Sequence, residues 1–524
     1  TDIYITGNST FVGDISANDA SFNFVGISKL QGQNLAVFGE FDSTWTTFYN
    51  RIDGEGNSTD YFASAIAFNA VGDVVVTGTK EDDTKNTSSG MVKVYKYYPN
   101  QQSWVQWGST IFGNEDQYER WGSSVDINGF GDTIIIGGRG SDITHNNGGL
   151  VRVFKMSKNY NNDVDWVQVG IDSDIEAAHS SAYMGSSVSM NGTGNIIAVG
   201  ANSDDTYHSN GGAVRVYYLN SSNRWQLQGT LESTRSSEQT GGGDGESLSL
   251  NGDGTVLVVG AYANSSITTS AGQVRIYKYG TSWTLAKTID ASNSYEYMGW
   301  SVSLNKKGNV AIFGSPSYSS NNYQGRVHVY RDNGTDWVSM ATLNGPRNYS
   351  YFGNSVDINN DGNIIAIGAY GDIDNNNDHG AVYVYKWDNG LNFSSGSFAS
   401  LGQTKNDGAN GQKFGEAVAL NDFGTRLATN YKSYNGSNKG SLQMWKIADL
   451  GYKTNYITID DISGNDASLN NINLLGDICG NDVSFNNMNL LGNTITKGDI
   501  SGNDVSFNNM DISCLLYTSD AADD

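Results

Sequence analysis

The chain has 524 residues, of which 55 are acidic and 31 basic, so its formal net charge is −24. This charge argues against nucleic acid or an anionic membrane as a partner, because both attract positive surfaces. The length exceeds what one simple hydrophobic core accommodates, and 64 Gly with only three Pro indicate many turns between short strands, so we expect a folded, repetitive β protein.

Neither membrane insertion nor a disulfide framework is expected. No apolar run approaches the roughly 18 residues of a membrane span, and only Cys479 and Cys514 are present. The chain starts at Thr1 without Met, so we expect a fragment whose beginning is missing. Residues 514–524 (CLLYTSDAADD) are similar to a translated sequencing adapter, the alternative being a natural tail, and we exclude them from the fold.

The two ends of the chain, residues 1–39 and 451–513, share one short motif. Residues 7–23 read GNSTFVGDISANDASFN and residues 492–508 read GNTITKGDISGNDVSFN, and further copies begin at Asp461 and Asp477. Short strands with this period cannot bury a face alone, so they predict a β-solenoid or an intertwined fibrous stalk, through which chains could form a homo-oligomer. A disordered Asn-rich linker is the alternative.

Between these ends, residues 40–450 contain seven copies of a longer unit. The first strands of the copies begin 54–63 residues apart, at Ala63, Gly122, Gly185, Gly245, Gly299, Gly353 and Gly415. Each copy continues with an Asn-x-x-Gly turn, a second strand that is nearly all apolar, a polar loop, and a third strand in which apolar residues alternate. Four short strands per copy predict one blade of a β-propeller.

The fourth strands predict how the ring closes. They begin at Trp45, Trp104, Trp166, Trp225, Trp283, Trp337 and, with Phe in place of Trp, at Phe398. Trp45 precedes the first copy, whereas the last copy ends near Ile447 without a fourth strand. We therefore predict an all-β, seven-bladed β-propeller closed by an N-terminal strand, with flanking β-solenoid or fibrous repeats.

The repeated pattern resembles that of a known family. Phe352-Gly353, Phe414-Gly415, Gly368-Ala-Tyr370 and Gly314-Ser-Pro316 carry it best, and it resembles the FG-GAP repeat, the blade of the integrin α-subunit head and of many bacterial and viral surface propellers. The flanking motif is similar to repeats in virus and phage fibre proteins. The resemblance implies a protein of adhesion type.

The resemblance also directs attention to calcium. Many FG-GAP blades hold Ca²⁺ in a loop Asp-x-Asp/Asn-x-Asp-Gly-x-x-Asp, and the nearest match here is Asp357-x-Asn359-x-Asp361-Gly362. Its closing acidic position is Ile365, and Ca²⁺ needs about six oxygen ligands, so a plain turn is expected. The chain is similar to a metal-free branch of the family.

A second loop is the better candidate for a cation. Asp372, Asp374, Asn376 and Asp378 alternate within seven residues and could surround Ca²⁺ with side-chain oxygens. Similar loops elsewhere, such as 81–83, look like ordinary solvated turns, which is the alternative. We expect no other cofactor.

Enzymatic chemistry has little support in the sequence. The five His residues fall in different copies without paired ligand spacing, and no Gly-x-Ser-x-Gly or phosphate-binding loop occurs, so no catalytic or cofactor-binding residue is assigned. The repeated Trp residues are interpreted as packing between blades rather than as carbohydrate platforms. The repeated third-strand residues Arg152, Arg215, Arg275 and Arg326 are interpreted as a structural or surface row paired with acids.

The favoured function is that of a structural or adhesion protein that is extracellular, at a cell surface or on a virion. Its propeller head would bind a protein or glycan on a cell surface, and its stalk would carry the head. The alternative is a carbohydrate-active enzyme, a lyase or hydrolase working in the central funnel, since propellers host many functions.

Overall fold

The computed structural model describes residues 20–22, 45–55, 60–158, 164–171, 174–242, 247–318, 322–374, 377–388, 396–402, 412–433, 438–447, 466–472, 478–489, 500–507 and 510–511. The chain divides into two compact units, Ser43–Ala448 and Thr1–Asp42 with Asp449–Asp524. All regular secondary structure in the described ranges is β-strand, which confirms the all-β prediction.

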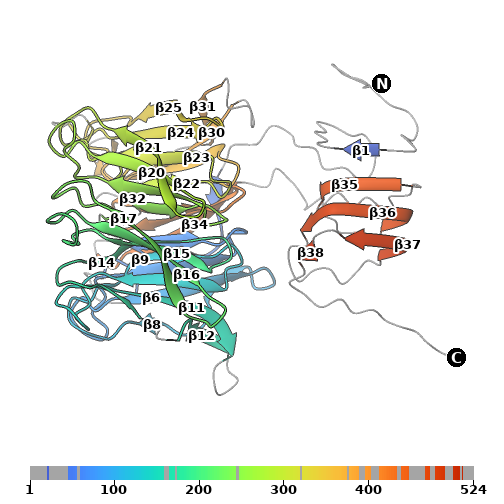
Figure 1. Cartoon of the computed structure of the whole chain (residues 1–524), viewed down its shortest axis with the longest axis horizontal. Coiled ribbons are helices and arrows are strands. Elements are labelled where there is room, and N and C mark those ends of the chain that lie inside the picture. The colour runs from blue at the N-terminus through green and yellow to red at the C-terminus, as the bar shows by residue number, and fades with distance from the viewer. Residues whose placement is uncertain are drawn as a thin grey trace. The chain divides into compact units, whose positions relative to one another are not determined.

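The unit Ser43–Ala448 contains seven antiparallel sheets, each with four strands paired in series, so the prediction of seven blades is confirmed (Figure 1). Blade 1 consists of β4 (Ala65–Phe68), β5 (Val74–Thr79), β6 (Met91–Tyr98) and β7 (Ser103–Gln106), and blade 2 of β9 (Trp121–Ile127), β10 (Thr133–Gly138), β11 (Leu150–Lys158) and β12 (Val164–Gln168). Blade 3 consists of β14 (Met184–Met190), β15 (Ile196–Ala201), β16 (Ala213–Leu219) and β17 (Trp225–Glu232), and blade 4 of β18 (Leu248–Leu250), β19 (Val256–Ala261), β20 (Gln273–Tyr279) and β21 (Trp283–Asp290).

Blade 5 consists of β22 (Val302–Leu304), β23 (Val310–Ser315), β24 (Arg326–Asp332) and β25 (Trp337–Asn344), and blade 6 of β26 (Val356–Ile358), β27 (Ile364–Ala369), β30 (Ala381–Trp387) and β31 (Phe398–Ser400). Blade 7 consists of β32 (Phe414–Leu420), β33 (Arg426–Tyr431), β34 (Ser441–Ile447) and β2 (Trp45–Thr47). Extra strands on the third strands of blades 1, 2 and 7 are β8 (Ile111–Phe112), β13 (Ile175–Glu176) and β3 (Ile52–Asp53). A separate hairpin in blade 6 pairs β28 (Ile373–Asp374) with β29 (Asn377–Asp378).

The hydrophobic core lies between successive blades. Every residue of β19 and of β27 is buried, as expected for apolar strands covered on both faces. One core cluster joins Val310 and Ile312 of blade 5 to Ile365 and Ile367 of blade 6. Each blade therefore buries its faces only against its neighbours, so the ring is stable as a whole rather than blade by blade.

The recurring glycines allow the blades to approach closely. A Cβ atom on Gly200 of β15 would overlap the carbonyl oxygen of Gly241 in the next blade, and the same overlap recurs for Gly314 against Gly353. At the junction of blade 7 with blade 1 the two positions hold Asn430 and Ala63 instead. The side-chain oxygen of Asn430 accepts the backbone N–H of Ala417 at 2.9 Å. This junction is therefore built differently from the other six.

The turns between first and second strands form a hydrogen-bonded ring, here called the turn ring. In six of its seven steps the second residue of a turn donates its backbone N–H to the equivalent carbonyl of the next blade, at 2.8–3.2 Å. The residues in blade order are Ala70, Gly129, Gly192, Gly252, Lys306, Asn360 and Asp422. Between blades 5 and 6 the side chain of Asn305 donates to Asn360 instead, at 2.9 Å. The step from Asp422 to Ala70 (3.0 Å) completes the circle.

The repeated Trp residues link neighbouring blades, as predicted. The indole Nε1 of Trp104 donates to the carbonyl of Phe48 at 3.1 Å, that of Trp166 to Trp107 at 2.9 Å, and that of Trp225 to Val169 at 3.2 Å. Each acceptor belongs to the preceding blade. The contacts explain why a large aromatic residue recurs at the start of the fourth strand.

The N-terminal strand closes the ring in the predicted way. In β2, Trp45 pairs antiparallel with Ile447 of β34, and Thr47 pairs with Trp445. Strand β3 continues this pairing, with Ile52 opposite Leu442. The last blade thus receives its fourth strand from the beginning of the chain, and no blade edge at this junction is left open.

In the second unit, strands from both ends of the chain pair in parallel. Strand β1 (Ala20–Phe22) pairs with β35 (Asp466–Ile472), followed by β36 (Ile478–Asn489) and β37 (Ile500–Phe507), and β38 (Met510–Asp511) also pairs with β36. Equivalent residues of the repeat lie side by side, Asp466 against Asp482 and Asp482 against Asp504. A β-solenoid needs such in-register stacking, but its closure into a solenoid or fibre stays a prediction.

Removing the indole of Trp45, in the strand that closes the ring, should destabilise the propeller more than removing the indole of Trp225 in blade 3. Trp45 is 2% exposed and its Nε1 donates to the carbonyl of Leu401 at 3.0 Å. We expect Trp45→Ala to lower the free energy of unfolding by about 3–5 kcal/mol. Trp225→Ala, at the equivalent and less buried position of blade 3, should cost less. Urea unfolding measures both, and a smaller loss for Trp45→Ala would contradict this mode of closure.

Candidate functional site

A pocket of about 260 Å³ lies on the central channel where the first strands begin, at the opposite end of these strands from the turn ring. We call this pocket the mouth. Six blades line it, and its walls come mainly from two adjacent repeated positions, the x and the Ser of the Gly-x-Ser-Val pattern. We call the x position the wall position. Residues of the lining at this position are Ser64, Ser123, Trp300, Asn354 and Glu416.

Two further repeated positions form the rim of the mouth. The first rim position lies two residues before the first-strand glycine, as Lys413 does before Gly415. The second lies two residues after the second-strand glycine, as Tyr370 does after Gly368. Both kinds of residue line the pocket. In blade 4 the equivalent glycine is Gly241, which lies against Gly200, rather than Gly245 as the sequence predicts. The backbone φ angle is positive at the first rim position for Lys413 (49°) and for Gln239 (53°), so the fold sets the same backbone conformation there in both blades.

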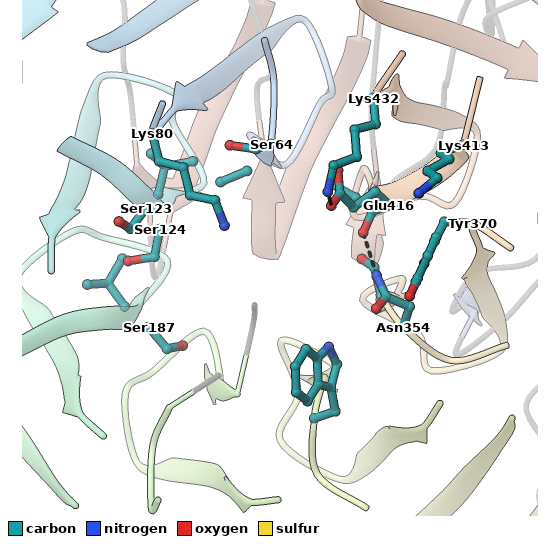
Figure 2. Close-up of a pocket in the computed structure, with 16 residues that line it drawn as sticks. Ser64, Lys80, Ser123, Ser124, Ser187, Asn354, Tyr370, Lys413, Glu416 and Lys432 are labelled. Carbon is teal, nitrogen blue, oxygen red and sulfur yellow. Dashed lines mark hydrogen bonds and ion pairs between the residues drawn. The ribbon is translucent and has the colours of Figure 1, made fainter. Parts of the chain in front are cut away.

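The rim carries positive charge on one side. Lys413 and Lys432 come from blade 7 and Lys80 from the adjacent blade 1, and in Figure 2 the side chains of Lys80 and Lys432 extend toward the open centre. Lys432 pairs with Glu416. Because the described lining holds three ammonium groups and one carboxylate, the mouth is locally cationic in a chain of net charge −24.

Aromatic side chains gather on the rim of blades 4 to 6. Trp300 and Tyr370 line the pocket. Tyr262 meets the Trp300 indole edge-on, with ring centroids 5.0 Å apart. Tyr351 stacks on Tyr370 at 4.9 Å, and Tyr323 stacks on Tyr351 at 5.2 Å. These five side chains are half-buried, so part of each remains accessible to a ligand.

Below the mouth, half-buried carboxyl groups link the first strands. Asp357 of blade 6 accepts hydrogen bonds from the Leu420 N–H at 2.6 Å and from the Ser303 hydroxyl at 2.8 Å, which join it to blades 7 and 5. Asp126 of blade 2 likewise accepts the Met190 N–H of blade 3 at 2.7 Å. Burial raises the pKa of Asp357 to about 6, although these donors oppose the shift. The two carboxyl groups tie the blades that support the mouth.

The predicted cation loop is only partly within the described residues. Asp372 is buried, accepts the Tyr383 hydroxyl at 2.5 Å and lies 3.7 Å from Arg347. The same loop position in blade 3 is Asp204, which is fully buried and pairs with Arg215 at 2.7 Å. Asn376 and the side chains of Asp374 and Asp378 lie outside the described residues. Within the described part, Asp372 thus has a structural role, and the cation site stays a prediction.

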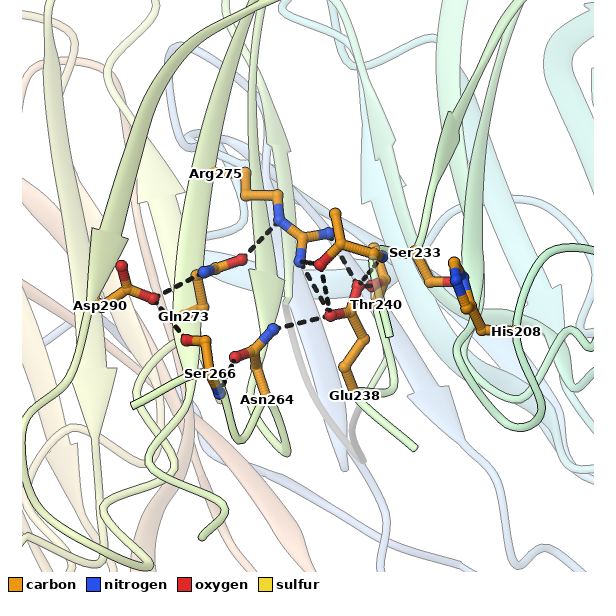
Figure 3. A network of polar contacts seen from close by, with 10 residues as sticks. His208, Ser233, Glu238, Thr240, Asn264, Ser266, Gln273, Arg275 and Asp290 are labelled. Atoms are coloured by element: carbon orange, nitrogen blue, oxygen red, sulfur yellow. Dashed lines mark hydrogen bonds and ion pairs between the residues drawn. The ribbon is translucent and has the colours of Figure 1, made fainter. Parts of the chain in front are cut away.

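The Arg row has the predicted acidic partners. The pair of Arg275 with Glu238 is buried, whereas the side chains of Arg152, Arg215 and Arg326 are 13–15% exposed. Arg275 and Glu238 lie within 2.9 Å of each other, and their side chains are 2% and 0% exposed. The Glu238 carboxylate also accepts hydrogen bonds from the Asn264 side-chain amide and the Thr240 hydroxyl, both at 2.7 Å (Figure 3). Burial alone would raise the pKa of Glu238, but the hydrogen bonds and charge of Arg275 hold it below its usual value. The pair fixes the segment before the first strand of blade 4.

Seven four-stranded blades around a channel with a polar mouth define a β-propeller. Within it, residues 341–385, from the fourth strand of blade 5 through the third strand of blade 6, match the family model of the FG-GAP repeat. The chain is therefore a β-propeller with an FG-GAP repeat, as its sequence predicts. No curated protein matches the chain.

The sequence prediction missed the mouth itself. It selected acidic loops by their resemblance to metal sites, whereas the lining residues occupy repeated positions at which the residue type changes from blade to blade. The wall position reads Ser64, Ser123, Ser186, Trp300, Asn354 and Glu416 in the six lining blades, while the neighbouring Gly and Val hardly vary. Variation at an inward-facing position of a regular repeat is the signal that could have found the site.

The raised pKa of Asp357 predicts how stability depends on pH. A group that binds its proton more tightly when folded contributes stability at low pH, and this contribution is lost as pH rises from about 4 to about 6. In Asp357→Asn the contribution is absent and one backbone N–H loses its acceptor. We expect the variant to melt lower at every pH, with a gap from the wild type that narrows between pH 4 and pH 6.

Asp361→Asn is the control for this experiment, since Asp361 is an exposed carboxylate paired with Lys307. Melting temperatures of the three proteins across pH 4 to 8 measure the effect. A gap for Asp357→Asn that widens as pH rises would show that the hydrogen-bond donors dominate over burial and that the pKa is lowered instead.

A cation in the Asp372–Asp378 loop predicts a calcium-dependent melting temperature. Millimolar Ca²⁺ should raise it and a chelator should reverse the rise, because the ion binds only the folded loop. Asp374→Asn should abolish the response, whereas Asp205→Asn in the equivalent loop of blade 3 should keep it. An unchanged melting temperature after chelation would remove the site from consideration.

Proposed function

We propose that the propeller is the binding head of an extracellular, cell-surface or virion protein, and that its ligand, a protein or glycan on a cell surface, docks at the mouth. FG-GAP propellers are typical of adhesion-type proteins, and residues 341–385 match that repeat. The observation that carries the proposal is the mouth. The mouth is concave and is lined by lysines and by half-buried aromatic side chains. Its lining residues differ in type from blade to blade at positions that are otherwise equivalent.

A binding role is favoured over catalysis. Among the lining residues that the structure describes, Glu416 is the single carboxylate, and it is paired with Lys432. Glycoside hydrolases generally use two carboxyl groups about 5–9.5 Å apart, one of them as an acid. This supports a non-enzymatic head over the alternative of a carbohydrate lyase or hydrolase.

Location and assembly follow from the same proposal. No helix in the described ranges is long and apolar enough to cross a membrane. The parallel in-register repeats from both chain ends would form a stalk that carries the head and joins chains into a homo-oligomer. The net charge of −24 disfavours nucleic acid as the ligand.

Filling the mouth should abolish attachment of the full chain to its host cells. Ser64→Trp places an indole at the wall position of blade 1, and the fold accepts one there because blade 5 carries Trp300 at the same position. We expect loss of cell binding, measured by flow cytometry with fluorescent protein, at an unchanged melting temperature.

Lys307→Ala is the matched control, since Lys307 lies in the turn of blade 5 at the other end of the first strands and forms an exposed ion pair that contributes little. Full attachment by folded Ser64→Trp would contradict docking at the mouth. Release of reducing ends from a bound glycan, surviving purification, would favour the enzymatic alternative.

A further inference from the structure

We infer that the mouth recognises a terminal acidic sugar, a pyranose that bears a carboxylate or a sulfate, on a surface glycan. This inference rests on the proposed function and names its ligand class. The sugar ring would pack against the aromatic side of the mouth while its acidic group meets the lysines on the other side.

Cations at the rim are confined to three consecutive blades. Lys413 and Lys432 belong to blade 7 and Lys80 to blade 1, and blade 2 carries Arg120 and Arg139 at the same two rim positions. The rim of blades 3 to 6 holds none, with Tyr183, Asn202, Gln239, Tyr262, Tyr297, Pro316, Tyr351 and Tyr370 at these positions. A positive arc within an acidic protein indicates a ligand with a localised negative charge.

Two ion pairs lie within the positive arc. Arg120 lies 3.5 Å from Glu81, and Lys432 pairs with Glu416. Lys413 and Lys80 line the pocket next to these pairs. The described lining thus brings three ammonium groups and one carboxylate to one small opening, where an anionic ligand can gain charge-assisted hydrogen bonds.

Aromatic groups predominate at the mouth on blades 5 and 6, and Tyr61 at the first rim position of blade 1 adds a further ring, 5.2 Å from Lys432. Trp300 of blade 5 is held edge-on by Tyr262, and Tyr370 of blade 6 is stacked on Tyr351. Farther out, Tyr295 and Tyr349 of the same blades are 50% and 47% exposed. The C–H face of a pyranose is apolar and flat enough to pack on such rings, whereas a bare phosphate or carboxylate gains nothing from them.

Size and hydroxyl groups favour the end of a glycan over other anions. At about 260 Å³ the pocket is just below the usual range for small-molecule sites, about 300–1,000 Å³, so it suits one or two sugar units rather than a folded domain. Ser64, Ser123 and Asn354 on the wall supply hydroxyl and amide groups that match sugar hydroxyls. A long polyanion would be repelled by the remaining acidic surface.

The test measures binding of the full chain to matched oligosaccharides by isothermal titration calorimetry. Each set shares one neutral core and differs only at the terminal sugar, which is neutral, carboxylated or sulfated, so that the two sources of negative charge are separated. We expect the carboxylated or the sulfated member to bind about tenfold or more tightly than the neutral core, with an affinity that falls as salt rises.

Two variants take their residues from other blades, so that the fold tolerates them. Lys80→Asn introduces the residue that blade 3 carries as Asn202, and Lys413→Gln introduces the residue that blade 4 carries as Gln239 with similar φ. Each should weaken binding of the acidic member about tenfold and leave the neutral core unaffected. Lys307→Ala, at the turn ring, should change neither.

The outcomes separate the inference from the proposed function. Equal affinity for acidic and neutral members, or no effect of Lys80→Asn and Lys413→Gln, overturns the acidic-sugar inference. In that case loss of cell attachment by Ser64→Trp would still uphold docking at the mouth. Cell attachment that survives Ser64→Trp overturns the proposed function even if an acidic sugar binds.

Discussion

The junction between blade 7 and blade 1 is the constraint on which the rest of the propeller depends. No blade has its own core, so every blade needs two neighbours, and the last one finds its second neighbour only if the ring closes. Closure combines the pairing of Trp45 with Ile447, the Asp422 to Ala70 step of the turn ring, and a hydrogen bond from Asn421 to Val71 at 3.0 Å. At this junction Asn430 and Ala63 stand where the other junctions bring two glycines together.

The same junction connects fold to function. The lysines of the mouth come from blades 7 and 1, which lie at opposite ends of the propeller sequence and meet only in the closed ring. The aromatic side comes from blades 4 to 6. Repetition supplies a rigid frame with seven equivalent inward positions, and departures from repetition give those positions different chemistry. A ligand that contacts both the lysines and the aromatic side chains therefore binds only to the closed ring.

Much of the fold could be predicted because each blade repeats the same physical signals: an apolar strand buried on both faces, an Asn-x-x-Gly turn, and Trp45 as a fourth strand without a blade of its own. The burial of Arg275 against Glu238 could not be predicted, since it depends on where a loop folds over a strand. The mouth was missed because its residues are distant in sequence and differ in type. Only closure brings Lys80 and Lys432 to one opening.

Amide hydrogen exchange of the full chain tests the central claim, that the seven blades form one ring closed at this junction. We expect the amides of residues 45–47 and 441–447, and the turn amides of Asp422 and Gly129, to exchange as slowly as the buried second strands, because they open only when the whole ring unfolds. Fast exchange confined to the junction of blades 7 and 1, with the other blades protected, would contradict it.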